Sequence, residues 1–394
     1  MNACYAFSGD PITYGHIDII KRSLQVFNHI TVAIGSNPSK RYLFSLDERT
    51  RMTEETLKCF GDSISVKSFD GLLVDFLKEN CITHIIRGIR STSDFEYEKE
   101  LSSINQTQNN GIDTWFLTSN KNMDVVSSSA SKEIVKHIGN SEIYVPIYIK
   151  NKLEQKLLDV IIIGVTGEIG AGKSYVSKVI DTNYQVHNYN IVNIDVDTIG
   201  RNVLEEYKEP IYKSIREQII CNFKGHDIIL DGYENNSCVF LDKSKIANII
   251  FDNKEKLDLY NKITKDAIIF KIKSEIRRLI YENQNIRDHR QLIIFLNSAL
   301  LIEANLLSMV NNNVIFVVAK DDIRIKRLTD RGYSNEEIAN RMSSQLNIDN
   351  KINLYKEKTN NDNYGNELII HNNDQNGSNN NILKEFGAFL KTLK

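Results

Sequence analysis

Residues 167–174 read Gly-Glu-Ile-Gly-Ala-Gly-Lys-Ser, and this glycine-rich run needs a particular local fold. An apolar run at residues 160–165 precedes it and predicts a strand, whereas Tyr175 and Val176 begin a helical pattern. Glycines let successive backbone N–H groups turn inward at the N-terminus of a helix, where they can hold phosphate groups. The sequence therefore predicts a phosphate loop at residues 167–174 that binds a nucleoside triphosphate. A glycine-rich turn without a ligand is the alternative.

Two side chains of the phosphate loop have expected roles. Lys173 would reach the outer phosphates of the nucleotide, and Ser174 would hold Mg²⁺. The residues expected to contact this ATP are Gly167, Gly170, Ala171, Gly172, Lys173, Ser174 and Tyr175.

Short apolar runs alternate with helical patterns along both halves of the chain. Strands are expected at residues 4–7, 29–34, 64–69, 84–89 and 114–117, and again at 160–165, 192–194, 292–296 and 314–318. Helices are expected at residues 46–60, 72–79 and 131–138. This alternation predicts an α/β fold with a parallel sheet flanked by helices in each half, a Rossmann-like sheet first and a sheet with the phosphate loop second. Such sheets bind ligands at the carboxyl ends of their strands.

The length of 394 residues corresponds to two or three domains of common size. A charged helical stretch at residues 150–158 follows Pro146 and leads into the strand expected at 160–165. We therefore expect one domain at residues 1–157 and a second at residues 158–394.

The composition argues against several classes of function. A formal net charge of -2 gives no general reason to expect nucleic acid or a membrane surface as a partner. The start of the chain lacks the basic flank and cleavage site of a signal peptide, and the longest apolar runs are too short to cross a bilayer. The five cysteines are scattered without metal-ligand spacing, which is typical of a reduced, cytoplasmic protein.

Two carboxylates end the strand that follows the phosphate loop. Asp195 and Asp197 are two residues apart, so their side chains point the same way from the strand end. One can accept a proton from an attacking hydroxyl while the other supports Mg²⁺. Capping of the next helix by these aspartates is the alternative.

A dense basic stretch follows the strand expected at residues 314–318. Its basic residues are Arg324, Lys326, Arg327 and Arg331. In a phosphoryl-transfer enzyme they would clamp the transferring phosphate, where charge develops. A solvated helix face is the alternative.

Most of residues 158–394 resemble dephospho-coenzyme A kinase. The resemblance depends on the phosphate loop, the Ile-Asp-x-Asp strand end, the basic stretch and the late Asn372-Asn373 turn. It also depends on Arg341 and Gln345, which are expected on one helical face. The chain departs from the family where Lys265-Asp266 replaces a His-Pro pair and Ala299 replaces a proline.

This resemblance implies roles for four residues. Asp197 would be the catalytic base for a ribose 3′-hydroxyl, and it would hold Mg²⁺ together with Ser174. Arg327 and Arg331 would contact ATP.

The first half contains a second motif directly after its first strand. Residues 8–16 read Ser-Gly-Asp-Pro-Ile-Thr-Tyr-Gly-His, and His16 falls in the first turn of the helix that follows. Backbone N–H dipoles favour phosphate oxygens there, and Gly15 permits close approach. A structural histidine is the alternative.

Three further loops follow later strands in order. They contain Ser39-Lys40, then Arg87-Gly88-Ile89-Arg90 with Asp94 to Glu98, and finally Ser127-Ser128-Ser129. Alone, each pattern would indicate a turn or a helix cap. Together with the histidine motif, they make nearly all of residues 3–157 resemble bacterial-type phosphopantetheine adenylyltransferase.

This second resemblance implies a role for each motif. His16 and Lys40 are expected at the α-phosphate of ATP, where they stabilise the transition state, and Ser8 orients the nucleophile. The expected ATP contacts are Ser8, Gly15, His16, Arg90, Glu98, Ser127, Ser128 and Ser129, and the expected phosphopantetheine contacts are Ser8, Lys40, Val74 and Arg87. The family usually reads Gly-Thr-Phe-Asp-Pro where residues 7–11 of this chain read Phe-Ser-Gly-Asp-Pro.

The two resemblances imply consecutive reactions on small molecules. The first would join ATP and 4′-phosphopantetheine into dephospho-coenzyme A, and the second would phosphorylate that product with ATP, with Mg²⁺ present. The resemblance of the first domain also implies a homo-oligomer formed through that domain. Two alternatives stay open: one half is a degenerate nucleotide-binding module that regulates the other, or a different nucleotidylyl transferase is fused to a different kinase.

Overall fold

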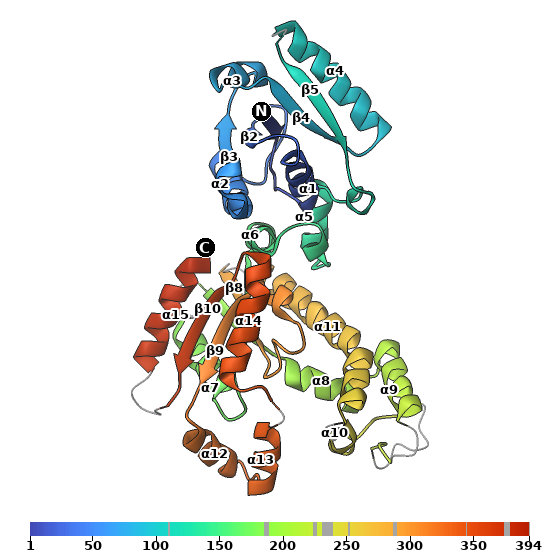
Figure 1. Cartoon of the computed structure of the whole chain (residues 1–394). Coiled ribbons are helices and arrows are strands. Elements are labelled where there is room, and N and C mark those ends of the chain that lie inside the picture. The colour runs from blue at the N-terminus through green and yellow to red at the C-terminus, as the bar shows by residue number, and fades with distance from the viewer. Residues whose placement is uncertain are drawn as a thin grey trace. The chain divides into compact units, whose positions relative to one another are not determined.

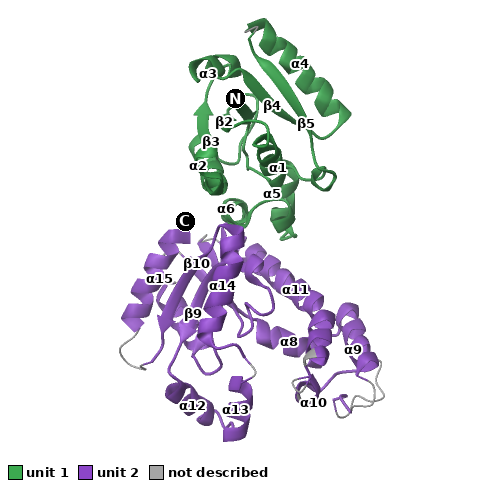
Figure 2. Cartoon of the chain, in the orientation of Figure 1, with its two compact units in different colours: residues 1–158 green, residues 159–394 purple. Residues whose placement is uncertain are grey.

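The computed structural model describes residues 1–108, 111–184, 189–223, 227–230, 239–250, 253–286, 290–343, 345–373 and 379–393. The chain forms two compact units, Met1–Leu158 and Asp159–Lys394, here termed unit 1 and unit 2 (Figure 2). Each unit contains one five-stranded parallel sheet flanked by helices (Figure 1). The predicted α/β class is therefore confirmed for both halves.

The sheet of unit 1 has the strand order β3-β2-β1-β4-β5. Its strands are β1 (Asn2–Phe7), β2 (His29–Gly35), β3 (Ile64–Phe69), β4 (His84–Ile89) and β5 (Asp113–Thr118). β1 and β2 are almost wholly buried, as expected for central strands covered by helices. The chain runs outward from β1 to β3 and then returns to the other side of β1. The loops after β1 and β4 therefore flank the switch point at which such sheets bind ligands.

Six α-helices accompany this sheet within the described part of unit 1. They are α1 (Tyr14–Ser23), α2 (Leu46–Leu57), α3 (Leu73–Glu79), α4 (Thr92–Gln108), α5 (Ser128–Lys136) and α6 (Ile147–Leu158). Ser45 starts α2 through a capping box with Glu48, each side chain accepting the other residue's backbone N–H. The helix expected at residues 46–60 ends at Leu57, where a 3-10 turn follows. α4 was not predicted, because its apolar residues do not form one stripe.

The sheet of unit 2 has the strand order β10-β9-β6-β8-β7. Its strands are β6 (Val160–Thr166), β7 (Tyr189–Asp195), β8 (Gln291–Asn297), β9 (Asn313–Val318) and β10 (Asn366–His371). Every residue of the central strand β6 is buried, which explains its unbroken apolar sequence. β10 lies at an edge of the sheet and mixes polar with apolar residues. Its sequence therefore lacks the apolar run that predicts a strand.

The helices of unit 2 separate into two groups. The first group is α7 (Lys173–Tyr184), α12 (Asp321–Thr329), α13 (Asn335–Ser343), α14 (Ile348–Asp362) and α15 (Asn379–Leu393), and the second is α8 (Val196–Glu205), α9 (Pro210–Asn222), α10 (Lys243–Ile250) and α11 (Lys254–Gln284). The second group forms an arm beside the sheet (Figure 1) with its own apolar core, which includes Val203, Tyr212 and Ile219. None of the described helices of either unit could span a membrane.

Candidate active sites

The loop between β1 and α1 is anchored by the side chain of Asp10. Its buried carboxylate accepts the backbone N–H groups of Leu43 and Phe44, each at 3.1 Å. Nζ of Lys132, from α5, lies 2.9 Å from the same carboxylate. The aspartate of the motif therefore ties together three segments around His16.

His16 is held in a defined protonation state. It is 8% exposed, and its Nδ1 accepts the backbone N–H of Thr13 at 3.0 Å, with the Thr13 hydroxyl 2.8 Å away. Burial, and next the positive charge of Arg90, lowers the pKa of His16 to about 3. Because Nδ1 is an acceptor on a neutral ring, the proton lies on Nε2, from which it can be donated to a phosphate oxygen.

Phe7 and Gly9, which depart from the family pattern, lie close to each other, and Phe7 contacts His16. The Phe7 ring stacks on the imidazole, with 4.3 Å between centroids and 13° between planes. Gly9 has a φ of +62°, and a Cβ on it would lie 3.1 Å from Cδ1 of Ile34 and 3.6 Å from the Phe7 ring. The aromatic group therefore lies over His16 from position 7, while position 9 needs glycine.

The end of β4 brings together residues expected on both substrates. Arg87 donates to the carbonyl of Ala6 at 2.9 Å, and its Nε lies 3.1 Å from Oε2 of Glu98 in α4. Arg90 lines a cavity with Tyr5, Gly15, Gly88 and Ser119. This cavity lies at the switch point between β1 and β4, beside His16.

The remaining expected residues of unit 1 occupy different environments. Ser127 caps α5 by accepting the N–H of Ala130 at 3.1 Å, and Ser128 donates to the carbonyl of Pro11 at 2.7 Å, which holds α5 against the β1–α1 loop. Ser129 lies in the first turn of α5. Lys40 is exposed in the loop after β2, whereas Val74 is buried in an apolar cluster with residues of β1.

Arg49 was missed by the sequence reasoning. It is buried on α2 and donates to the carbonyls of Ser8 and Gly35 and to the hydroxyl of Ser36. It therefore fixes the loops that follow β1 and β2. No motif marks this arginine, because its role depends on two loops that are far apart in the chain.

The phosphate loop of unit 2 is packed too closely for side chains at two glycines. A Cβ on Gly167 would lie 2.2 Å from the carbonyl oxygen of Val317, and one on Gly172 would lie 2.2 Å from Nδ2 of Asn372. The same Asn372 amide donates to the carbonyl of Ala171 at 2.9 Å. The ends of β9 and β10 therefore pack so closely against the loop that positions 167 and 172 leave no room for a side chain.

Lys173 begins α7 and folds back onto the loop. Its Nζ donates to the carbonyl of Gly167 at 3.0 Å. Burial lowers the pKa of Lys173 to about 8, and the charge of Asp197 opposes that shift. Ser174 and Tyr175 complete the first turn of α7, and the hydroxyl of Tyr175 is 3.0 Å from Oδ1 of Asn379. Lys173 thus stays largely protonated at neutral pH, as a phosphate ligand must.

The two aspartates after β7 have different roles. Asp195 caps α8 by accepting the N–H of Thr198 at 3.0 Å, so the capping alternative applies to it. Burial raises the pKa of Asp197, whereas Lys173 and a hydrogen bond from the Ala299 backbone N–H act in the opposite direction. That N–H exists because Ala299 stands where the family usually has proline.

The basic stretch after β9 does not act as one clamp. Arg324 is 3% exposed, and its Nη1 lies 2.9 Å from Glu168 and 2.7 Å from Asp321. Arg327 donates to the carbonyls of Ala171 and Asn372, at 3.1 and 3.0 Å. Arg331 is exposed in the turn after α12. The phosphate-clamp hypothesis therefore no longer includes Arg324, whose charge is already paired with the carboxylates of Glu168 and Asp321, and it stays open for Arg327 and Arg331.

The expected helical face shared by Arg341 and Gln345 is not present in the structure. α13 ends at Ser343, so Arg341 and Gln345 do not share one helical face as expected. Instead, Oε1 of Gln345 accepts the N–H of Ile169 at 3.2 Å, which gives the phosphate loop another support.

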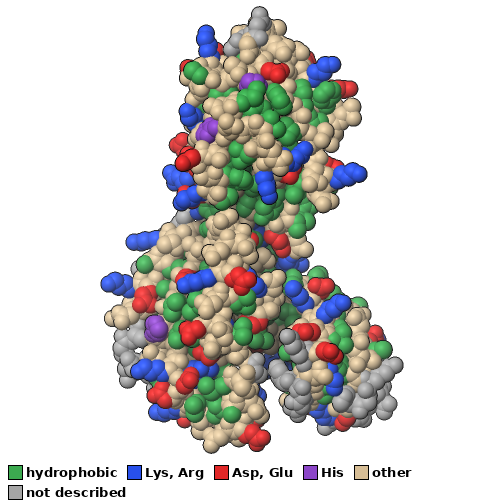
Figure 3. All heavy atoms as spheres, in the orientation of Figure 1, with side chains coloured by type: hydrophobic (Ala, Val, Ile, Leu, Met, Phe, Trp, Pro, Cys, Tyr) green, Lys and Arg blue, Asp and Glu red, His purple; other side chains and the backbone are tan. Residues whose placement is uncertain are grey.

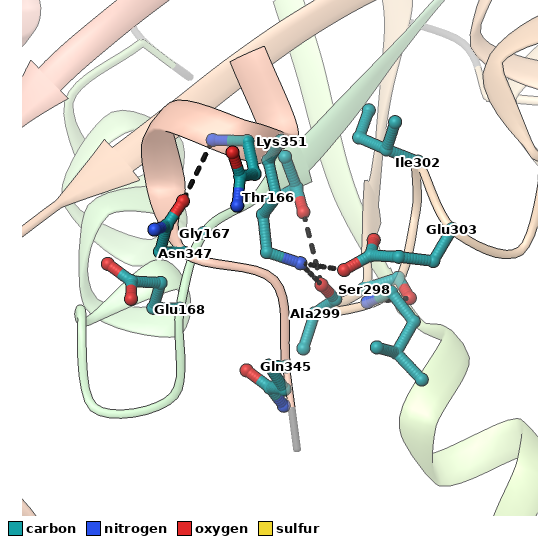
Figure 4. Close-up of polar contacts among 12 residues, drawn as sticks. Thr166, Gly167, Glu168, Ser298, Ala299, Ile302, Glu303, Gln345, Asn347 and Lys351 are labelled. Atoms are coloured by element: carbon teal, nitrogen blue, oxygen red, sulfur yellow. Dashed lines mark hydrogen bonds and ion pairs between the residues drawn. The ribbon is translucent and has the colours of Figure 1, made fainter. Parts of the chain in front are cut away.

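A buried lysine joins three segments beneath the phosphate loop (Figure 4). Lys351 of α14 is fully buried, pairs with Glu303 and donates to the carbonyl of Ala299 at 2.7 Å. Thr166, the last residue of β6, reaches the same carbonyl at 3.5 Å. Glu303 ends the run Leu-Leu-Ile-Glu at residues 300–303, directly after Ala299, and no local pattern singled out Lys351. This cluster holds the loop after β8 beside Asp197.

Comparison with known proteins gives a family match for each half of the chain. Residues 161–367 match the family model described as dephospho-CoA kinase, and residues 8–134 match the one described as cytidylyltransferase-like. The chain is 41% identical over 157 residues to the phosphopantetheine adenylyltransferase of Petrotoga mobilis, covering 40% of this chain and 96% of that protein. It is 42% identical over 152 residues to that of Mannheimia succiniciproducens, covering 39% and 95%. For that of Thermobifida fusca the identity is 43% over 149 residues, covering 38% and 90%.

Proposed function

The chain belongs to the dephospho-CoA kinase family in its C-terminal half and to the phosphopantetheine adenylyltransferases in its N-terminal part, and from this membership we propose that it catalyses the last two steps of coenzyme A synthesis. The first reaction transfers the adenylyl group of ATP to 4′-phosphopantetheine. The second phosphorylates the resulting dephospho-CoA. One observation carries the proposal. The same chain contains members of two enzyme families, and the product of the first reaction is the substrate of the second.

We assign the first reaction to residues 1–157 and the second to residues 158–394. In the first, a phosphate oxygen of 4′-phosphopantetheine attacks the α-phosphorus of ATP, and the bond from that phosphorus to the β-phosphate oxygen breaks. The nucleophile is already an anion, so positioning and charge stabilisation suffice. Nε2–H of His16 donates to the α-phosphate, and Lys40 offsets its charge.

The other residues of unit 1 hold the two substrates. Ser8 orients the attacking phosphate, and Arg87 and Val74 lie on the phosphopantetheine side. The ATP side consists of Gly15, Arg90, Glu98, Ser127, Ser128 and Ser129. Arg90 and the serines at the N-terminus of α5 hold the leaving pyrophosphate, because backbone N–H groups at a helix start favour anions.

In the second reaction, the ribose 3′-hydroxyl of dephospho-CoA attacks the γ-phosphorus of ATP, and ADP leaves. Asp197 accepts the hydroxyl proton, a role that its raised pKa favours. The phosphate loop and Lys173 hold the β- and γ-phosphates. Arg327 and Arg331 offset the charge that develops on the transferring group.

The residues of this site suit Mg²⁺. The Ser174 hydroxyl and the Asp197 carboxylate are oxygen ligands, which Mg²⁺ prefers, and Asp197 lies near Lys173, the neighbour of Ser174. Among the described residues no group of three or more His, Cys, Asp or Glu could hold a metal alone, so nucleotide phosphates would complete its ligands. Bound there, Mg²⁺ would neutralise phosphate charge.

We also propose that unit 1 forms a homo-oligomer through α4 and β5. None of the described side chains of α4, residues 92–108, is buried. Phe95, Ile104, Trp115 and Phe116 are all at least 36% exposed, and hydrophobic side chains gather over these elements (Figure 3). Light scattering should show an oligomer that Phe116→Asp dissociates. A monomeric wild-type chain would contradict this assignment.

The exposed thiols of Cys59 and Cys81 suit the reducing cytoplasm, where we place the enzyme.

The test is a mass-spectrometric assay of the purified chain with ATP, Mg²⁺ and 4′-phosphopantetheine. Wild type should form coenzyme A, Lys173→Ala should stop at dephospho-CoA, and His16→Ala should form neither product. If supplied dephospho-CoA is phosphorylated but 4′-phosphopantetheine is not consumed, unit 1 is a degenerate module. If neither compound reacts, the substrates are wrong.

A further inference from the structure

The phosphate loop itself carries a carboxylate, Glu168, which is apart from the Lys351 cluster (Figure 4). A carboxylate among backbone N–H groups that bind phosphates opposes nucleotide binding, because like charges repel strongly where water is scarce. Glu168 is 14% exposed at its side chain, so solvent screens little of that repulsion. The loop therefore needs a compensating positive charge.

Arg324 supplies that charge from α12 and is fixed on several sides. Its Nη1 lies 2.9 Å from Oε1 of Glu168, and its Nε donates to the carbonyl of Ile169 at 3.0 Å. A Cβ on Gly170 would lie 3.0 Å from the Arg324 carbonyl oxygen, so the α12 backbone packs directly on the loop. Three consecutive loop residues, at positions 168–170, thus pack against Arg324.

The same contact sets the position of Arg327. This residue lies three positions further along α12, on the same side of the helix, and donates to the carbonyls of Gly170 and Ala171 at 3.3 and 3.1 Å. Movement of Arg324 would therefore move the arginine assigned to the ATP phosphates.

We propose that Arg324 is a positioning residue that neutralises Glu168 and so keeps the phosphate loop able to accept a nucleoside triphosphate. The inference rests on the proposed kinase site. Removal of Arg324 alone should therefore weaken nucleotide binding more than removal of both Arg324 and Glu168. Only the variant without the arginine leaves an unpaired carboxylate in the loop.

The experiment measures phosphorylation of supplied dephospho-CoA at varied ATP. Arg324→Met should raise the KM for ATP about 30-fold, Glu168→Gln should raise it about threefold, and the double variant should return to within about fivefold of wild type. The Glu168→Gln variant also tests the pair without removing the buried arginine. Arg278→Met is the matched control, because it removes an exposed ion pair with Glu282 in α11 of the same unit.

Adenylyl transfer by unit 1, measured on the same samples, reports the amount of chain added, and thermal unfolding reports whether unit 2 of each variant is folded. A double variant as impaired as Arg324→Met would overturn the proposal, as would variants that lower thermal stability but leave the KM for ATP unchanged. A wild-type chain that does not phosphorylate dephospho-CoA would contradict the proposed function instead. In that case the Lys173-dependent part of ATP binding, measured calorimetrically, should still follow the same order of variants.

Discussion

The two proposed active sites both lie at the carboxyl ends of parallel sheets, yet their titratable groups differ in charge. In unit 1, His16 is neutral, stacked on Phe7, and holds its proton on the nitrogen that faces away from Thr13. In unit 2, Lys173 and Arg324 keep their charges close to carboxylates. A buried charge is costly unless it is paired, whereas a neutral imidazole needs only hydrogen-bond partners.

The nucleophiles explain this difference. The phosphate proposed to attack in unit 1 needs no base, so that site requires no free carboxylate, and its Glu98 is paired with Arg87. The hydroxyl proposed to attack in unit 2 must lose a proton, which requires a base, and Asp197 is the group assigned to that role. A carboxylate close to nucleotide phosphates in turn requires nearby cations. On the proposed assignments, the sheet determines where ATP binds, while the protonation state of the nucleophile determines which side chains surround it.

The largest expected effect separates the two sites through the base. Asp197→Asn should lower the rate of dephospho-CoA phosphorylation about a thousandfold, because the 3′-hydroxyl loses its proton acceptor. Adenylyl transfer should stay within about twofold of wild type, because that step has no use for a base. Product formation by mass spectrometry measures both steps in one sample. An equal loss in both would contradict the independence of the sites.

The converse variant acts on unit 1. His16→Ala should slow adenylyl transfer by about a hundredfold to a thousandfold, because it removes a preorganised donor to the α-phosphate. Phosphorylation of supplied dephospho-CoA serves as the control and should be unchanged. A loss below about threefold would show that Arg90 and Lys40 stabilise the transition state without the histidine.

The pH dependence of the two steps should differ as well. The lowered pKa of Lys173, about 8, means that its ammonium is present below that pH and lost above it. The kcat/KM of phosphorylation for ATP should therefore fall up to about tenfold per pH unit on the alkaline side. His16, with a pKa of about 3, is neutral throughout the physiological range. The adenylyl-transfer profile should keep its shape in His16→Gln, and a changed limb between about pH 5 and 8 would contradict a neutral histidine.

The smallest effect tests the stacking ring. Phe7→Leu should lower kcat/KM of adenylyl transfer about fivefold, because an aromatic contact contributes about 0.5–1.5 kcal/mol beyond its buried area. Phe7→Tyr should stay near wild type because it keeps the ring. An equal loss in both variants would show that the ring does not position His16. The NMR-measured pKa of His16 should rise only in Phe7→Leu.

The fold was predictable where sequence and burial agree locally. Central strands such as β6 are continuous apolar runs because both of their faces are covered. β10 and α4 lack such a signal, because one is an edge strand and the other has no buried side chain in the described residues 92–108. Their places depend on tertiary context that no local window contains.

For the sites, motifs contiguous in the chain were recognisable, whereas their supports were not. His16 and Lys173 follow strands within short patterns that can be recognised from spacing alone. The partners Arg49, Lys351 and Arg324 act through loops that the fold brings together, so their roles follow from topology. The expected helical face of Arg341 and Gln345 failed because α13 ends before the second residue.

The arrangement of Phe7 and Gly9 has a consequence for how this loop can change over generations. Substituting Phe7 by glycine alone uncovers the imidazole, and substituting Gly9 by phenylalanine alone forces a side chain at positive φ toward Ile34. Each single step between the two residue orders is therefore unfavourable, although either complete order places one ring in the loop. We therefore expect positions 7 and 9 to be epistatic, and engineering should exchange both residues together or neither.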